Sequence, residues 1–275
     1  MEHKKYRREQ IADLILASLT EHKDQIAREY VSQPIAHFVI DDLLPTELAH
    51  EIHGAFPATS QMKLKKSLRE RKYVTAQMDR CAPLLEETIF SFHDPRIVAL
   101  VSELTGLEQV EPDRQLYAGG ISVMNGAHFL NPHIDNSHDK ARQRYRVLNL
   151  LYYVSPEWQQ SYGGDLELWP DGPRGKPISI PCTFNRLVVM ATSPTSWHSV
   201  NAIRRQLPRC CVSNYYFSGV SPTREDYFHV TSFRGRPEQP LRDLVLRADI
   251  RLRMLLRKIR PTGIVENKHF YRKSV

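Results

Sequence analysis

The stretch NPHIDNSHD, residues 131–139, offers two ways to place a histidine beside an aspartate. His133 and Asp135 end a run that predicts a β-strand, where residues i and i+2 face the same side about 6.6 Å apart. Two such side chains can converge on one metal ion, whereas the adjacent residues His138 and Asp139 would diverge on a strand. We therefore expect His133 and Asp135 to be metal ligands and the second pair to lie in a solvated loop.

The His-x-Asp spacing is weak evidence alone, because an isolated pair of this kind is more often a hydrogen-bonded surface pair. His22 and Asp24 repeat the spacing in a predicted helix, where a two-residue step turns about 200° and separates the side chains. A metal site also needs a third ligand. His198 lies in the short apolar stretch SWHSV, which a β-barrel could bring back beside the first pair. Two histidines and one carboxylate suit Fe(II) oxygenases, because they leave one face of the metal open.

The open positions of such a site can admit a 2-oxo acid and then dioxygen. The distal carboxylate of 2-oxoglutarate is best held by a planar guanidinium, and Arg209 begins the next predicted strand, RCCVSNYYF. Tyr153 could donate a hydrogen bond to the same carboxylate, and Asn149, four residues earlier, would face the same side of its strand. We expect these three residues to bind the cosubstrate. Arg204 and Arg205 are alternatives to Arg209, but they lie in a predicted turn.

The composition is that of an ordinary globular protein. The chain has 275 residues, of which 41% are hydrophobic and 25% charged, so a sizeable core is expected. No apolar run approaches the roughly 20 residues of a membrane helix, and the charged start MEHKKYRREQ does not look like a secretory signal. The cysteines lack a C-x-x-C motif and are expected to be reduced packing residues: Cys81, Cys182, Cys210 and Cys211. We expect a cytoplasmic protein.

The elements that must position these residues change in character along the chain. Residues 1–110 predict mainly helical support, with a strand near 36–41 and a basic, exposed loop at 60–80. Helices are expected at 8–31, after Pro45, at 83–92 and from Asp94 to Gly106. Residues 115–218 contain eight short runs typical of strands, separated by turns. We therefore expect a single catalytic domain over 1–275, of α+β class but mainly β, with a double-stranded β-helix or jelly-roll core.

Residues 219–275 predict a C-terminal extension with a basic amphipathic helix at 241–259. Residues 241–275 contain ten basic and three acidic residues, whereas residues 1–240 hold 28 of each sign, so the tail carries the whole net charge of +7. The main apolar arc is expected to pack on the barrel: Leu241, Leu244, Val245, Ala248, Leu252, Leu255, Leu256 and Ile259. A thinner apolar stripe, Leu246, Ile250 and Met254, leaves open a homodimer through this helix or contact with an acidic surface. Nucleic acid is not an expected partner, because no recognition module is visible.

The order and spacing of these motifs resemble the iron(II)/2-oxoglutarate-dependent dioxygenase superfamily, in the bacterial type of its prolyl-4-hydroxylase-like branch. The similar stretches are HIDN at 133, YRVLNLLYYVSPEW, YGGDLELWP, FNRLVVMATSPTSWHSV and PRCCVSNYYFS, which ends at 218. The resemblance implies that His133, Asp135 and His198 bind iron and that Arg209, assisted by Tyr153, holds 2-oxoglutarate. Animal prolyl hydroxylases have a further tyrosine before the iron pair. This chain offers Val123, Met124 or Asn125 there, which allows a different cosubstrate network.

The resemblance also implies an activity. It predicts a 2-oxoglutarate-dependent non-haem iron dioxygenase that uses Fe(II), 2-oxoglutarate and O2, with ascorbate as a candidate reductant, and releases succinate and CO2. The expected reaction is hydroxylation of an unactivated C–H in a small molecule, such as a natural product, an amino acid or a saccharide. Desaturation or ring closure would use the same ligands.

The alternative is a hydroxylase acting on a prolyl or other residue of a polypeptide. A small-molecule enzyme should close its mouth with a lid, for which the loop 60–80 or the segment 220–240 is available, whereas a polypeptide enzyme should leave an open groove. A binding protein with a vestigial site would require a lost ligand or a lost arginine, and this sequence has lost neither.

Overall fold

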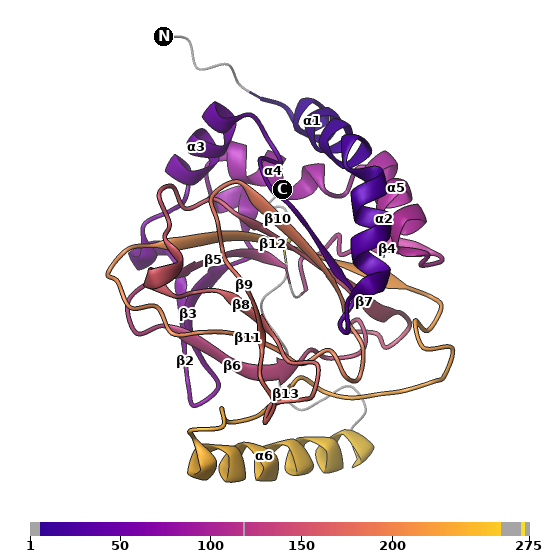
Figure 1. The fold of residues 1–275 in the computed structure, drawn as a ribbon, viewed down its shortest axis with the longest axis vertical. Helices are drawn as coiled ribbons and strands as arrows, with labels where there is room; N and C mark the ends of the chain where they lie inside the picture. The colour runs from indigo at the N-terminus through magenta and orange to yellow at the C-terminus, as the bar shows by residue number, and fades with distance from the viewer. Residues whose placement is uncertain (1–5, 118, 260–270, 273–275) are drawn as a thin grey trace.

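The chain folds around one curled antiparallel sheet, as seen in a computed structural model that describes residues 6–117, 119–259 and 271–272. Five helices cover one side of the sheet, and a sixth lies across the opposite end of the molecule (Figure 1). The helices are α1 (Arg8–Glu21), α2 (Lys23–Ser32), α3 (Thr46–Gly54), α4 (Pro83–Ser91), α5 (Pro95–Thr105) and α6 (Pro240–Ile259). Short 3-10 helices span Thr59–Gln61, Met78–Arg80 and Gln160–Tyr162.

The helices begin and end where the sequence predicts, with one difference. α5 is capped by the Asp94 side chain, which accepts a hydrogen bond from the Arg96 backbone N–H, and it ends at Gly106 with a left-handed φ of 67°. The single helix expected at 8–31 is instead two helices that meet at His22. His22 leaves the helical conformation (φ −93°, ψ 8°), and its Nδ1 hydrogen-bonds the Ser18 carbonyl at 2.8 Å.

The eight strands predicted within 115–218 are all present, as β5 to β12. The strands are β1 (His37–Ile40), β2 (Lys63–Lys66), β3 (Glu70–Thr75), β4 (Val110–Pro112), β5 (Gly120–Met124), β6 (Phe129–Ile134), β7 (Tyr145–Tyr153), β8 (Leu166–Leu168), β9 (Ile178–Ile180), β10 (Arg186–Ala191), β11 (His198–Val200), β12 (Arg209–Ser218) and β13 (Ser232–Phe233). They follow the order β1-β10-β7-β12-β5-β3-β6-β11-β8-β9, with β13 on β6, β2 on β3 and β4 on β12. This curled arrangement is the predicted double-stranded β-helix, and the fold class is confirmed.

Alternation along β7 and β12 separates the core from the interior of the barrel. Tyr152 and Tyr216 point to the helices and are fully buried in the larger hydrophobic cluster, where the Tyr216 hydroxyl donates to the Phe92 carbonyl. The residues between these core positions, such as Tyr153 and Arg209, line a cavity on the other face. The two faces of the sheet therefore have different roles, one packed against α1–α5 and one lining the cavity.

The basic segment 60–80 was expected to be an exposed loop, and this expectation is wrong. β2 and β3 form a hairpin there, and β3 joins β5 to β6 in the sheet. The hydrophobic alternation of a typical strand is missing because one face of the hairpin carries charged side chains into the cavity, including Lys65, Glu70 and Lys72.

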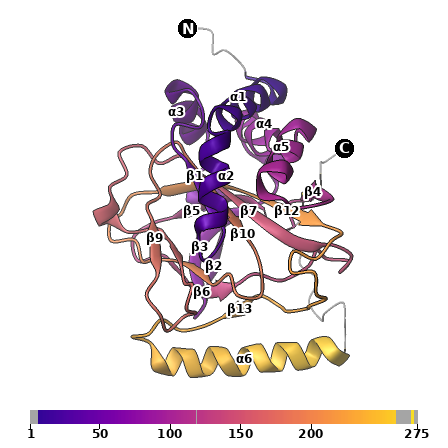
Figure 2. The same ribbon diagram turned by 45° about the vertical axis from the view of Figure 1, so that its right-hand side comes forward.

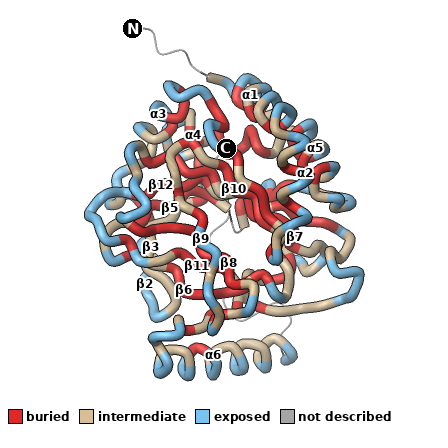
Figure 3. The backbone as a smooth tube through the Cα atoms, viewed as in Figure 1, coloured by how far each residue is buried: buried red, intermediate tan, exposed pale blue. Residues whose placement is uncertain are grey.

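The packing of α6 is also the reverse of the expectation. Six large residues of its main apolar arc are exposed, each by between 52% and 79%: Leu241, Leu244, Val245, Leu252, Leu255 and Ile259. Leu246 of the thin stripe is buried instead, at 2% exposure. Ion pairs to Arg69 and Arg234, from Asp249 and Asp243 of α6, hold the helix in place. Figure 3 shows the resulting exposure along this helix. Among the described residues, no helix is long and apolar enough to cross a bilayer.

Candidate active site

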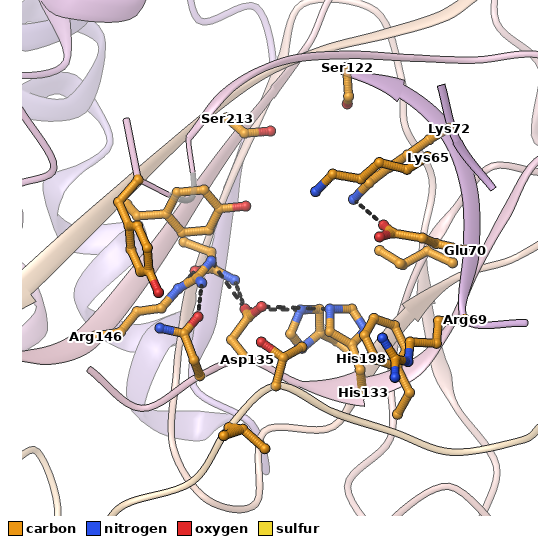
Figure 4. A pocket seen from close by; sticks show the side chains of 18 of the residues that line it. Lys65, Arg69, Glu70, Lys72, Ser122, His133, Asp135, Arg146, His198 and Ser213 are labelled. Carbon is orange, nitrogen blue, oxygen red and sulfur yellow. Dashed lines mark hydrogen bonds and ion pairs between the residues drawn. The ribbon is translucent and has the colours of Figure 1, made fainter. Parts of the chain in front are cut away.

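Three side chains converge on one point inside the barrel. His133 lies near the end of β6, Asp135 directly follows that strand, and His198 begins β11. β6 and β11 are antiparallel neighbours, and their register sets His198 opposite His133. One ligand atom from each of the three lies within 4.8 Å of the other two, so the set could hold a metal ion (Figure 4). The structure thus brings together the three residues that the sequence predicts as ligands.

The two imidazole rings present the same nitrogen to this point. Nδ1 of His133 donates to the Asn131 carbonyl at 3.0 Å, and Nδ1 of His198 donates to the Ser196 carbonyl at 2.9 Å. A carbonyl can only accept, so Nδ1 carries the proton, and Nε2 is the nitrogen that can offer a lone pair to a metal. These Nε2 atoms lie 3.7 Å and 3.4 Å from the Asp135 carboxylate oxygens. Burial, and then the neighbouring His198, lowers the pKa of His133 to about 3, which favours the neutral ligand form.

Asp135 is held in place by two further side chains. Asn149 donates from Nδ2 to Oδ2 of Asp135 at 2.8 Å, and Arg146 Nη2 lies 3.2 Å from the same oxygen. Arg146 also donates from Nε to Oδ1 of Asn149 at 3.0 Å and lies over the ring of Tyr215. Burial alone would raise the pKa of Asp135, but Arg146 and the two histidines lower it well below its ordinary value. The carboxylate is therefore ionised and fixed in orientation.

A second group of polar atoms lines the same cavity. Arg209 is 3% exposed and extends over the ring of Tyr153, which is 1% exposed. Nε of Arg209 and the hydroxyl of Tyr153 have no hydrogen-bond partner among the described residues. Arg209 also forms no ion pair with a carboxylate in that part of the chain, and its Nη1 lies 3.8 Å from the Met124 sulfur. Burial raises the pKa of Tyr153, so its hydroxyl stays protonated and can donate.

The turn before β8 makes room for Arg209. Gly164 has a φ of 80°, and a Cβ at this position would lie 2.7 Å from Cδ of Arg209. A glycine is therefore required there by both the backbone conformation and the space. Arg204 and Arg205, the alternatives to Arg209, are exposed and do not line the cavity.

His138 and Asp139 do not form the solvated loop that the sequence predicts. His138 is 8% exposed, its ring packs on Tyr145 with centroids 4.3 Å apart, and the same two residues form an isolated β-bridge. Asp139 accepts from Arg144 Nε at 3.0 Å. The pair is ordered because a backbone bridge and an aromatic contact fix it, and neither feature can be read from residue type.

The cavity that contains all these groups measures about 870 Å³. Its wall includes residues that the sequence did not indicate: Lys65 and Lys72 on the hairpin, Tyr215 on β12, Phe228 in the segment before β13, and Arg253 on α6. Tyr215 could have been found by period-two alternation from Arg209, whereas the others depend on long-range packing.

A comparison with known families agrees with this geometry. Residues 119–217 match the 2OG-Fe(II) oxygenase superfamily, over the segment that runs from the start of β5 into β12. That segment contains the three converging residues and Arg209. Residues 119–217 are therefore similar to a 2OG-Fe(II) oxygenase domain. Enzymes with this domain are dioxygenases that use Fe(II), 2-oxoglutarate and O2. Arg209 Nε and the Tyr153 hydroxyl, which have no hydrogen-bond partner among the described residues, are donors of the kind that a carboxylate of 2-oxoglutarate requires.

Solved structures show the same fold at low sequence identity. A prolyl-4-hydroxylase from Pseudomonas putida superposes with a TM-score of 0.55 and 14% identity, covering 71% of this chain and 98% of that chain. A prolyl 4-hydroxylase from Phytophthora capsici gives a TM-score of 0.52 and 15% identity, covering 94% and 81% respectively. The search of curated proteins found no match to this sequence. The likeness is one of fold and leaves the substrate unassigned.

Proposed function

We propose that this oxygenase hydroxylates an unactivated C–H of a small molecule, with iron bound by His133, Asp135 and His198. The reaction would consume substrate, 2-oxoglutarate and O2 and release hydroxylated product, succinate and CO2. Bound Fe(II) would supply the redox chemistry that couples cosubstrate decarboxylation to C–H oxidation. The observation that carries this proposal is the convergence of two imidazole Nε2 atoms and an ionised carboxylate in a cavity that also contains Arg209, a buried arginine without a carboxylate partner among the described residues.

The donor set fits Fe(II) in composition. Two imidazole nitrogens and one carboxylate bind one face of the metal and leave the other face for cosubstrates. The backbone carbonyls behind His133 and His198 fix the rings, and Arg146 with Asn149 fixes the carboxylate. The proposed role of these contacts is to hold the ligands in place before the metal arrives.

Arg209 and Tyr153 are the proposed partners of the distal carboxylate of 2-oxoglutarate. A buried guanidinium without an anionic partner is costly, and a bound carboxylate would satisfy both it and the Tyr153 hydroxyl. Asn149 lines the same cavity, but its amide is already bonded to Asp135. We therefore propose that Asn149 acts on the cosubstrate through the orientation of the metal ligand.

The walls of the cavity favour a small-molecule substrate over a polypeptide. Three segments outside the family-matched region line it: the β2–β3 hairpin, residues 228–233, and α6. These include both segments that were expected to supply a lid. Because segments on both sides of residues 119–217 line the cavity, we propose that residues 1–275 form one catalytic domain. A prolyl or other residue of a polypeptide remains the alternative substrate, and it would require the hairpin or α6 to move aside.

The test is anaerobic binding of Fe(II) and 2-oxoglutarate, followed by succinate release when oxygen is added with candidate substrates and ascorbate. His133→Ala and His198→Ala should abolish iron-dependent succinate formation. Arg209→Ala should retain iron binding and raise the 2-oxoglutarate concentration needed by about tenfold or more, because charge-assisted hydrogen bonds are lost. Unchanged turnover in either histidine variant would refute the ligand assignment. Turnover with proline-containing peptides but with no small molecule would favour the alternative substrate.

A further inference from the structure

The cavity wall carries a strong excess of positive charge. Among its described lining residues, nine are lysine or arginine and three are aspartate or glutamate, a difference of six. Arg146 is paired with Asp135, and Arg209 is the proposed partner of the cosubstrate. Arg69 and Arg253 pair with Asp249, which does not line the cavity. The remaining basic residues lie on the hairpin, on the loop after Asp139 and on α6, and so on the walls that would surround a substrate.

The hairpin places two of these cations directly against each other. Lys65 of β2 and Lys72 of β3 are cross-strand partners in register, and both line the cavity (Figure 4). Like charges directly opposite on neighbouring strands are destabilising. Glu70 pairs with Lys72 at 3.1 Å, whereas Lys65 makes no hydrogen bond or ion pair with the described residues. Burial, and then the charge of Lys72, lowers the pKa of Lys65. On this hairpin the carboxylate of Glu70 thus faces two ammonium groups, those of Lys65 and Lys72, and forms an ion pair with Lys72.

A second cation lies on the loop that follows Asp139. The Arg142 guanidinium lies over the Phe228 ring, 3.9 Å from its centroid, and its buried Nη2 has no hydrogen-bond partner in the part of the chain that the structure describes. Burial, and then the charge of Arg257, lowers the pKa of Arg142. A cavity with such walls raises the local concentration of anions.

We propose that Lys65 and Lys72 bind an oxyanion group of the substrate, a phosphate or a carboxylate, so that the enzyme selects acidic small molecules. This proposal rests on the proposed function, because it concerns the substrate of the same cavity. An oxyanion between the two ammonium groups would offset their repulsion and satisfy Lys65. The histidine–aspartate centre opens on the same cavity, so the anchored group would fix the position of the substrate relative to the metal.

Calorimetric titration with inorganic phosphate and with malonate tests this proposal on metal-free protein, without turnover. At least one anion should bind, and Lys65→Gln should weaken that binding about tenfold. Lys66→Gln is the matched control, because Lys66 is the next residue of β2, is exposed and does not line the cavity. Preference for phosphate or malonate identifies which oxyanion the site takes.

Three outcomes would overturn the anion site. These are no binding of either anion, equal affinity in the wild type and Lys65→Gln, or binding that Arg209→Ala removes while Lys65→Gln leaves it intact. The last result would place the anion in the cosubstrate site. Loss of Fe(II) binding in the same preparation would instead count against the proposed function, so the two failures are distinguishable.

The outer face of α6 carries a separate inference. Its six exposed apolar residues lie within one arc of the helix, and Arg247, Arg251 and Lys258 follow one edge of that arc. Asp243 and Asp249, the acidic residues of α6, are turned to ion pairs with Arg234 and Arg69. Figure 2 shows α6 along the rim of the molecule, away from α1–α5. The outward face is therefore apolar with a purely cationic edge.

We infer that α6 docks by this arc onto a bilayer surface that contains anionic lipid. An amphipathic helix of this kind buries its apolar face at the headgroup boundary while basic residues contact anionic lipid. A second copy of the chain is a poorer occupant. An antiparallel pair related by a two-fold axis would put the cationic edges of both helices on the same side, where they repel. Because Arg253 and Arg257 of α6 also line the cavity, docking would hold the cavity wall close to the membrane.

Vesicle sedimentation tests the docking. The protein should bind vesicles of equal phosphatidylcholine and phosphatidylglycerol, bind less at high salt, and bind little to phosphatidylcholine alone. Leu252→Asp should remove the binding without loss of fold, because Leu252 is 57% exposed. Leu207→Asp is the control, since Leu207 is also exposed but lies in a turn outside α6. Absence of binding to the anionic vesicles, equal binding to both kinds, or a dimer that Leu252→Asp disrupts in place of vesicle binding would each refute the inference.

Discussion

The carboxylate of Asp135 is oriented by contacts that come from β7. Asn149 and Arg146 meet the same oxygen and each other, while the two histidines approach from β6 and β11. An ion pair on the surface would not need this support, because water would solvate it. The network is understandable if the carboxylate must point in one direction before a metal binds.

Replacement of Asn149 separates two roles for this residue. Asn149→Ala removes the 2.8 Å hydrogen bond to Asp135, and loss of such a contact behind a metal ligand typically weakens metal binding about tenfold to a hundredfold. We expect anaerobic titration with Fe(II) or Co(II) to show this loss, with affinity for 2-oxoglutarate reduced only as a consequence. If metal affinity were unchanged and only 2-oxoglutarate affinity fell, Asn149 would act directly on the cosubstrate, as the sequence alone predicts.

At the scale of elements, the turn before β8 contacts Arg209, the residue proposed to hold the cosubstrate. Gly164→Ala would place a Cβ 2.7 Å from Cδ of Arg209 in a backbone with φ of 80°. We expect a weaker affinity for 2-oxoglutarate, measured by anaerobic titration of the iron-loaded protein. We also expect a loss of stability of about 1 kcal/mol from the backbone strain.

A second glycine separates strain from displacement of the arginine. Gly172 has a similar φ of 76°, and a Cβ there would have no neighbour within 4 Å. Gly172→Ala should therefore reproduce the loss of stability and leave 2-oxoglutarate affinity intact. Equal effects of the two variants on affinity would show that Gly164 does not position Arg209.

Elements with a local pattern could be predicted from the sequence, and elements set by their partners could not. The period-two pattern of β6 and β7 predicts which side chains of one strand share a face, and it pairs His133 with Asp135 and Asn149 with Tyr153. The approach of His198 depends on strand order, which the resemblance supplied. Its register opposite His133 required the structure.

The failures have a common physical cause. The β2–β3 hairpin was missed because its inward face contacts a polar cavity and not a core, so the hydrophobic alternation that marks a strand is absent. For α6, amphipathicity identified an apolar arc but not what the arc contacts. The ion pairs of Asp243 with Arg234 and of Asp249 with Arg69 determine which side of α6 faces the barrel. Arg234 and Arg69 lie outside α6, and no sequence pattern indicates these pairs.

At the scale of the whole molecule, a half-buried histidine links the helical layer to the sheet. His93, between α4 and α5, has Nε2 2.9 Å from Oδ1 of Asn214 on β12. Burial lowers the pKa of His93 from 6.5 to about 4. The folded state therefore keeps this ring neutral over a pH range in which the unfolded chain binds a proton.

The sign of the effect on stability follows from this difference. Above pH 6.5 neither state is protonated at His93, so the residue adds no pH dependence. As the pH falls from 6.5 to 4, protonation stabilises only the unfolded chain, and the free energy of unfolding should decrease by up to about 3 kcal/mol. His93→Gln keeps a donor to Asn214 but cannot be protonated, so its stability should fall less over the same range. Urea denaturation of both proteins, with chelator present so that His133 is metal-free in each, measures the difference. Parallel curves between pH 4 and 6.5 would show that His93 is protonated equally in the folded and unfolded states.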